Sequence, residues 1–516
     1  MPSLNNRRRT MGRSSAPVPT IPYLYFTAEE GSSNYLKVYI TGTLSVNLEY
    51  SRDMVNWEPF PMATTDNGVY LSDSEGGGAY VRGCNPAGIS IDANNYLQFT
   101  YGSRNARVHC TGSLRGLINA GDDMNNPVNA VPNDYCFYHL FENAQWLVSA
   151  PKLDIPILTS RCYYEMYLGC TQLAMPSDMS AIREAPAYSC ERMYSGCTSL
   201  TTAKIPLNAT VLGNACYARM YLNCTGLTTV EAFPSKVGEN CLSETFKGCT
   251  SLSVVPDLPA IDLMKGCYTA MFSGCTSLVN APALPATTLA VSCYHQMFLG
   301  CTSLVDAPAL PATTLAGSCY SSMFSGCTSL VNAPVLPATT LASSCYGSMF
   351  LGCTSLVNAP ALPATTLAGS CYSSMFLGCT SLVNAPALPA TTLADSCYSS
   401  MFSGCTSLVN APALPATTLT SSCYNQMFSD CVALVTAPDL PALALVSRCY
   451  HLMFRYCSHL SFIRAMFTTT PSTSYTNRWV DGVASAGTFV KNSAATWTTT
   501  GNNGVPSGWT ILYETP

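Results

Sequence analysis

A repeated unit of 26 residues is the feature that most constrains this chain. The unit CYTAMFSGCTSLVNAPALPATTLAVS begins at Cys267, and a degenerate copy begins at Cys449. Near-copies in steps of 26 residues begin at Cys293, Cys319, Cys345, Cys371, Cys397 and Cys423, and looser copies begin at Cys241, Cys216, Cys190, Cys162 and Cys136. One unit cannot bury its Tyr, Met, Phe, Cys and Leu side chains alone. We therefore expect about 13 units over residues 136–470 to stack into a solenoid with a continuous core.

The residues within one unit predict its local structure. A period of 26 residues falls within the roughly 20 to 29 residues of a leucine-rich repeat. Tyr268, Met271 and Phe272 are spaced to lie on one side of a helical turn that ends at Gly274. The segment LVNAPAL predicts a short strand, because Pro282 within it and Pro285 directly after it lack backbone donors. The expected fold is an α+β repeat solenoid.

The flanking segments predict a small domain before the array and a cap at each end. Residues 1–20 form a basic, Pro-punctuated extended arm, and residues 21–101 alternate as in a small antiparallel β-sandwich. Residues 102–135 are interpreted as a transition that covers the first repeat. Residues 471–516, rich in Thr, Gly and Asn, would be the C-terminal cap, since an uncapped solenoid exposes its core.

The repeat resembles a known family. CTSL followed by a Pro-containing strand and then CYxxMFxGC resembles the BspA-like (Treponema-type) leucine-rich repeats over roughly residues 136–470. The ending from Trp479 to Ile511, and the segment before the array, resemble modules of such proteins in gut Bacteroidales and their phages. The resemblance implies a surface-exposed adhesion or interaction protein rather than an enzyme.

Most of the 27 cysteines fall in two rows of the array, eight residues apart within each unit. The first row holds Cys267, Cys293, Cys319, Cys345, Cys371, Cys397 and Cys423, and the second holds Cys275, Cys301, Cys327, Cys353, Cys379 and Cys405. Eight helical residues would separate the two by about 12 Å, beyond the roughly 7 Å limit for a disulfide. We expect a ladder of buried free thiols acting as small apolar side chains. Disulfides between repeats and metal ligation are the alternatives.

Charged and catalytic residue types are sparse. From residue 266 to residue 430 the only charged side chains are those of Asp306, Asp395 and Asp430. The five histidines, His109, His139, His295, His451 and His459, show no common repeat offset that would make a ligand set. No phosphate loop, nucleophile elbow or HExxH motif occurs. We therefore predict no catalytic residue, no cofactor and no metal.

Composition excludes several classes of protein. The net charge of -5, from 24 basic and 29 acidic residues, argues against a nucleic-acid binder. No apolar run reaches the roughly 18 residues that span a bilayer. The N-terminal arginines are not followed by the apolar segment of a secretory signal peptide.

The basic arm and the array predict different contacts. Arg7, Arg8, Arg9 and Arg13 are interpreted as an anchor for an acidic surface of a larger assembly, with a solvated tail as the alternative. The LVNAPALPATTL segment hardly varies between units. An invariant face suits either a neutral spacer or a weak, multivalent grip on a repetitive polymer such as a surface glycan.

These features together predict a non-enzymatic phage virion protein, a tail or head fibre or decoration protein made in the host cytoplasm. Its expected partners are other virion proteins, through the arm and the β-domain, and a host-surface or mucosal glycan or protein, through the array. A homo-oligomer is compatible with this interpretation. The alternative is a bacterial cell-surface adhesin of the same family, located at the cell surface or outside the cell. A weaker alternative is an enzyme with a small catalytic domain before the array.

Overall fold

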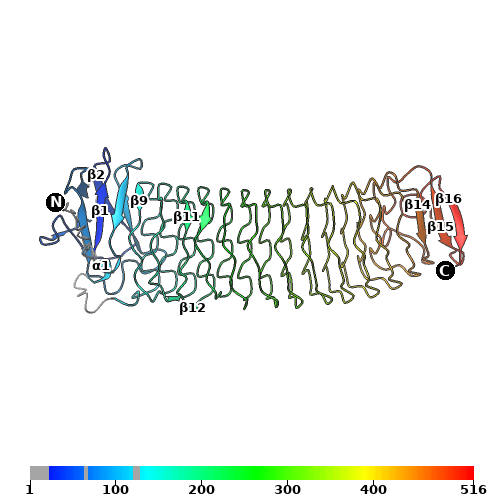
Figure 1. The fold of residues 1–516 in the computed structure, drawn as a ribbon, viewed down its shortest axis with the longest axis horizontal. Helices are drawn as coiled ribbons and strands as arrows, with labels where there is room; N and C mark the ends of the chain where they lie inside the picture. The colour runs from blue at the N-terminus through cyan, green and yellow to red at the C-terminus, as the bar shows by residue number, and fades with distance from the viewer. Residues whose placement is uncertain (1–22, 63–67, 120–127, 516) are drawn as a thin grey trace, which may run out of the picture.

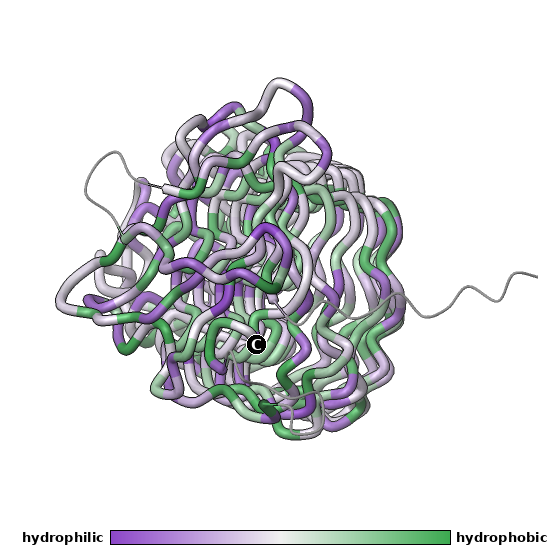
Figure 2. Tube along the Cα trace, turned by 90° about the vertical axis from the view of Figure 1, so that its left-hand side faces the viewer, coloured by the Kyte–Doolittle hydropathy of each residue, from purple (hydrophilic) through white to green (hydrophobic). Residues whose placement is uncertain are grey.

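The computed structural model describes residues 23–62, 68–119 and 128–515. The molecule is an elongated solenoid whose coils lie side by side between an N-terminal sheet region and a C-terminal group of strands (Figure 1). Seen along its length, successive coils follow nearly the same course behind one another (Figure 2). The predicted leucine-rich-repeat solenoid with a 26-residue period, preceded by a sheet region, is confirmed.

The N-terminal region consists of two sheets packed face to face. The first has the strand order β4-β3-β6-β1-β8-β9, with β1 (Leu24–Ala28), β3 (Leu48–Ser51), β4 (Glu58–Pro59), β6 (Ala79–Gly83), β8 (Val108–Thr111) and β9 (Leu147–Ser149). The second has the order β5-β2-β7, with β2 (Asn34–Thr41), β5 (Val69–Leu71) and β7 (Tyr96–Tyr101). Alternating side chains of both sheets are buried between them, and the rings of Phe26 and Phe99 lie 5.3 Å apart there.

Both sheets continue into the first coil of the array. On one side β8 pairs in parallel with β9, with Val108 opposite Leu147. On the other side the Phe99 amide of β7 donates to the Leu140 carbonyl at 2.9 Å. The Phe99 ring also stacks on Phe141 of that coil at 5.5 Å. The N-terminal region therefore covers the end of the solenoid core.

The segment that was expected to be a helical turn is a chain of tight turns instead. Within the described residues the only helix is α1 (Arg115–Ile118), which has four residues. In the unit over residues 292–301, every second amide donates to the next coil, as Tyr294 does to the Cys319 carbonyl at 3.0 Å. The amides between them donate three residues back within the coil, as Met297 does to the Tyr294 carbonyl at 3.2 Å. Every amide from residue 292 to residue 301 is thereby bonded, half of them to a neighbouring coil.

Left-handed residues enforce this pattern. Ser292, Gln296 and Gly300 have φ angles of 53°, 55° and 69°, so every fourth residue leaves the right-handed helical region. A continuous α-helix needs right-handed angles throughout to bond each amide four residues back. The prediction of a helix on this side was therefore wrong, although the same side chains point inward. We call residues 292–301 and their equivalents the turn segments.

The rest of each coil forms only short parallel contacts, which lie in two separate rows (Figure 1). β10 (Glu184–Ala185) pairs with β12 (Val211–Leu212), and β11 (Thr202–Ala203) pairs with β13 (Thr229–Val230). In the regular units the pairing shrinks to single bridges, in a row that holds Asn280, Asp306, Asn332, Asn358, Asn384 and Asn410. The prolines that follow lack the donors that a longer ladder would need. A second row has two bridges, between Thr288 and Thr314 and between Thr340 and Thr366.

Stacked rings fill the core. The Phe272 and Phe298 rings lie 5.8 Å apart with planes within 8°, and Tyr294 and Tyr320 repeat this geometry at 5.8 Å and 9°. The phenylalanines are fully buried and the tyrosines are 1% exposed. At the C-terminal end the Trp479 ring lies 6.1 Å from the rings of Tyr450 and Phe454 and closes these rows.

Three parallel strands end the chain. β14 (Phe462–Ala465) pairs with β15 (Thr488–Asn492), which pairs with β16 (Thr510–Glu514). β14 also bridges to the last regular coil, with Thr436 opposite Phe462. The row of bridges that includes Asn410 therefore continues, at the C-terminal end, as a three-stranded parallel sheet.

Candidate binding surface

Apolar hollows recur between neighbouring coils of the array. They lie along the segment APALP of each unit, residues 281–285 in the unit that begins at Cys267, which we call the proline segment. A hollow of about 430 Å³ is lined by the proline segments that contain Leu284 and Ala309, together with Asp257. A second, of about 440 Å³, lies between the segments that contain Leu362 and Ala387. The hollows repeat because the alanines are too small to fill the gap between coils.

One substitution within the array shows how the hollow depends on a side chain. Val335 stands where the other regular units have alanine, and it is 77% exposed. The hollow that it lines has a volume of about 240 Å³, against about 440 Å³ where Ala387 stands. The two added methyl groups account for the narrower space. The smaller of these two hollows is therefore the one that valine lines.

Neutral polar side chains run beside the hollows. The Asn332 side-chain amide donates to the Asp306 carboxylate at 3.4 Å, and that of Asn410 donates to Asn384 at 3.0 Å. The two threonines that follow each proline segment, such as Thr287 and Thr288, are exposed. With three aspartates as the only charges between residues 266 and 430, this face offers hydrogen bonds and apolar contact without long-range attraction.

The two predicted cysteine rows lie in the core. All 27 cysteines are free thiols in this structure, and Cys84 is exposed while the other 26 are buried. Burial raises the pKa of Cys301, Cys353 and Cys405 to about 12. Since the thiolate is the nucleophile and the metal ligand, these side chains are held in an unreactive form.

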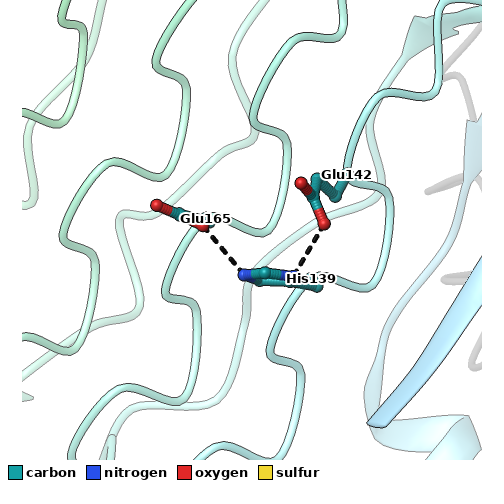
Figure 3. Close-up of side chains that lie close together, drawn as sticks. All are labelled: His139, Glu142 and Glu165. Carbon is teal, nitrogen blue, oxygen red and sulfur yellow. Dashed lines mark ion pairs between the residues drawn. The ribbon is translucent and has the colours of Figure 1, made fainter. Parts of the chain in front are cut away.

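A charged cluster that the sequence analysis did not single out lies at the start of the array. His139 lies between two carboxylates, with Nδ1 2.7 Å from Glu142 of its own coil and Nε2 2.8 Å from Glu165 of the next coil (Figure 3). Arg192 of the third coil contacts Glu165 at 2.9 Å. The ring of Tyr138 stacks on His139 at 3.8 Å. The cluster joins three successive coils.

The electrostatics of the cluster favour a proton on the imidazole. Burial lowers the pKa of His139, but the contacts with Glu142 and Glu165 more than offset it, so the pKa lies above its usual value. Burial raises the pKa of Glu165, yet His139 and Arg192 bring it below its usual value. The three side chains offer ligand atoms within 4.8 Å of one another. Each imidazole nitrogen already faces a different carboxylate on opposite sides of the ring, so we interpret the cluster as an ion-pair chain that links coils.

The repeat alignment contains the signal for this cluster. His139, Glu165, Arg192, Arg219 and Glu244 occupy one offset in five successive units, and each has a positive φ. Arg219 also contacts Glu244 at 2.5 Å. Opposite charges at one offset become neighbours as soon as the coils stack.

The other predicted sites are scattered or lie elsewhere. Arg7, Arg8, Arg9 and Arg13 fall outside the described residues. His109 contacts Glu29 at 2.9 Å in the N-terminal region, and His451 contacts Asn425 at 3.0 Å near the C-terminal end. His295 and His459 lie in different units, so the structure does not bring the histidines together.

The fold and its rows define a class of protein, a leucine-rich-repeat solenoid in which identical residues stack from coil to coil. Comparison with protein families narrows the class. The model of the BspA type leucine rich repeat region matches residues 133–253 and 190–330, in six copies. The repeats within residues 133–330 therefore match BspA-type leucine-rich repeats, as the resemblance predicted.

Three solved structures match parts of the chain at low sequence identity. A leucine rich cell surface protein from Faecalibacterium prausnitzii A2-165 is 16% identical over 76% of this chain and 91% of its own, with a TM-score of 0.35. A T. pallidum leucine rich repeat protein is 17% identical over 37% and 86%, with a TM-score of 0.21. A chain of the TLR13-ssRNA13 complex is 13% identical over 78% and 53%, with a TM-score of 0.23.

Two further searches found nothing, one among curated proteins and one for membrane-spanning helices in the described residues. A search of curated proteins finds no match. No helix within the described residues has the length and apolar character needed to cross a membrane.

Proposed function

We propose that this protein is a non-enzymatic attachment protein of a phage particle, a tail or head fibre or decoration protein whose array holds surface or mucosal glycans. In this proposal the basic arm and the N-terminal sheets bind other virion proteins. The array then extends away from the particle. The elongated shape, with the N-terminal region at one end, supports this arrangement (Figure 1).

The observation that carries the proposal is the neutral face repeated along the array. Three hollows lie between pairs of neighbouring coils, and each regular coil presents a pair of exposed threonines and one Asn or Asp of the bridging row. A sugar ring has an apolar face and a polar rim of hydroxyls, and this face offers a partner for each. A single coil offers little contact area, so affinity would come from several coils that engage one polymer together.

The hollows allow a direct test with full-length protein. Ala361 and Ala387 line one hollow. We expect the double substitution A361V/A387V to narrow it, as in the hollow that Val335 lines, and to weaken binding to mucin or host capsular polysaccharide several-fold. V335A should have the opposite effect. L351S is the matched control, because it changes the turn segment, where Ser325 stands one coil earlier. Equal binding by all four proteins would show that the proline segments do not hold the ligand.

The number of coils gives a second test. Deleting residues 319–370 removes two whole periods and leaves the register of the remaining coils intact. Multivalent binding should then weaken more steeply than in proportion to the coils lost. Binding that does not depend on coil number would place the ligand at one end of the protein instead.

A bacterial cell-surface adhesin remains the alternative, because the same face would serve either protein. The two differ in location, so mass spectrometry of purified particles and of bacterial envelopes separates them. Recovery with envelopes alone would reject the phage proposal and leave the adhesion function standing. The weaker alternative, an enzyme with its catalytic domain before the array, predicts loss of an activity on deletion of residues 21–135.

A further inference from the structure

The last strand of the solenoid presents an unusual surface. All five residues of β16 are exposed, and three of them are large and apolar, with Ile511 36%, Leu512 51% and Tyr513 64% exposed. One edge of β16 pairs in parallel with β15. Among the described residues the other edge has no strand partner. Apolar side chains beside free backbone groups make such an edge a template for a further strand.

The other end of the molecule has a protected edge. The two N-terminal sheets end at short strands: β4, which has only the two residues Glu58 and Pro59, and β5, which has three residues. A short strand with a charge and with a proline that lacks an amide donor resists pairing. Because the two ends differ in this way, head-to-tail stacking of copies is disfavoured. Pairing between two C-terminal ends is the arrangement that uses only the open edge.

We propose that two copies of the chain associate through β16, which pairs antiparallel with itself about a two-fold axis at Leu512. In this register Leu512 faces Leu512 of the partner subunit, Ile511 faces Tyr513 of the partner subunit, and Thr510 faces Glu514 of the partner subunit. Apolar residues meet apolar residues, and no like charges oppose each other. Such an interface is isologous and closed, so it yields dimers rather than fibres.

The size of the contact sets its strength. A five-residue strand and the exposed surface around it bury less than the roughly 800 Å² per partner of a standard interface. The dimer should therefore be weak and should depend on protein concentration. It would carry an N-terminal region at each end, twice the length of one array apart. The proposal is independent of the ligand of the array.

Sedimentation velocity of the full-length protein over a concentration series tests the pairing. We expect the mean mass to rise from one chain of 55.0 kDa toward two chains. L512K places two lysines opposite each other across the axis and should hold the protein at the mass of one chain. V331K, at a residue 39% exposed in the middle of the array, should dimerise as the wild type does. A wild-type protein that stays at one chain, a dimer that survives L512K, or a mass above two chains would overturn the proposal.

The register has its own test. Ile511 faces Tyr513 of the partner subunit, so I511K should weaken the dimer and the double substitution I511K/Y513E should restore it. In a C84S background, L512C should form a covalent dimer on mild oxidation, since the other thiols are buried. V331C in the same background should not. Failure of the double substitution to restore the dimer, or equal cross-linking of the two cysteine variants, would exclude this register.

Discussion

The Sγ atom of Cys301 lies 3.1 Å from the carbonyl oxygen of Phe272 in the preceding coil, to which it donates a hydrogen bond. The same oxygen accepts a hydrogen bond from the amide of Cys275 at 3.0 Å. The Cys301 thiol therefore donates to the second lone pair of the Phe272 carbonyl oxygen. The contact recurs one coil later between Cys327 and Phe298, also at 3.1 Å. A thiol suits this offset because it fills the space of a small apolar side chain and also satisfies a carbonyl.

This arrangement predicts which thiols react. In folded protein near pH 8, iodoacetamide should modify Cys84 rapidly and leave the 26 buried thiols intact, because burial holds residues such as Cys301 and Cys353 protonated. After unfolding without reductant, all 27 should react. Mass spectrometry of the labelled peptides gives both counts. Rapid labelling of the second cysteine row in folded protein would contradict the burial, and a shortfall after unfolding would indicate disulfides.

Two glycines in neighbouring segments should respond to alanine in opposite ways. Gly326 has a φ of 73°, and an added Cβ would lie 3.6 Å from the nearest atom, so the cost is one of backbone conformation. G326A should lower the free energy of unfolding by about 1–2 kcal/mol. Gly317 has no left-handed φ and stands where Val291 and Ser343 stand in other units, so G317A should stabilise by about 0.4–1 kcal/mol. Urea unfolding of both variants measures the difference, and a shift of the same sign in both would refute the assignment of the left-handed row.

The cluster around His139 should make the first coils sensitive to pH. Because its pKa is raised in the folded protein, its stabilising contribution is complete below the unfolded value of 6.5 and is lost as the pH rises through the folded value. The pKa of Glu165 is lowered, so its contribution is present above 4.5 and is lost as the pH falls through the folded value. The cluster should therefore stabilise most between about pH 4.5 and 6.5.

Hydrogen exchange of the amides from residue 137 to residue 168 can follow this dependence. H139N keeps a side chain that tolerates the left-handed φ of 56° and removes the titrating group. Protection of these amides in the variant should no longer fall between neutral and alkaline pH as it does in the wild type. An identical pH profile in both proteins would show that the imidazole does not carry a proton between the two carboxylates.

The period could be predicted from the sequence because stacking puts each residue beside its copy 26 positions away. The helical turn could not be excluded, because Tyr268, Met271 and Phe272 have the spacing of one helical face. What decides against a helix is bonding between coils, together with left-handed residues that are often not glycine, such as Gln296. Propensity describes one segment at a time, and here the neighbouring coil overrides it.

The sequence predicted the residue types of the candidate binding surface, but it did not predict the hollows between its coils. The scarcity of charge and the close repetition of LVNAPALPATTL are visible in the sequence. The hollows depend on the gap between coils, which no single unit specifies. The charged row from His139 to Glu244 becomes visible only when units of 25 to 27 residues are aligned by offset. Tertiary neighbours therefore give meaning to residues that look incidental along the chain.

The row of stacked phenylalanine rings predicts how far the destabilisation caused by one substitution extends along the array. Phe350 is fully buried, and its ring lies 5.7 Å from those of Phe324 and Phe376. F350A removes the ring between two neighbours that the backbone ladders hold apart, so a cavity should remain, at a cost of about 3–5 kcal/mol. Since each coil contacts only its neighbours, the loss of stability should be greatest in the coils that contain these three residues.

Hydrogen exchange along the array measures this spread. Amides of the turn segments at Phe324, Phe350 and Phe376 should lose protection in F350A, while those near Phe272 and Phe454 should keep it. L351S is the control, because Ser325 and Ser403 occupy the same offset in other coils and the side chain is not part of the core. Uniform loss of protection from residue 267 to residue 457 would mean that the array unfolds as one cooperative unit rather than coil by coil.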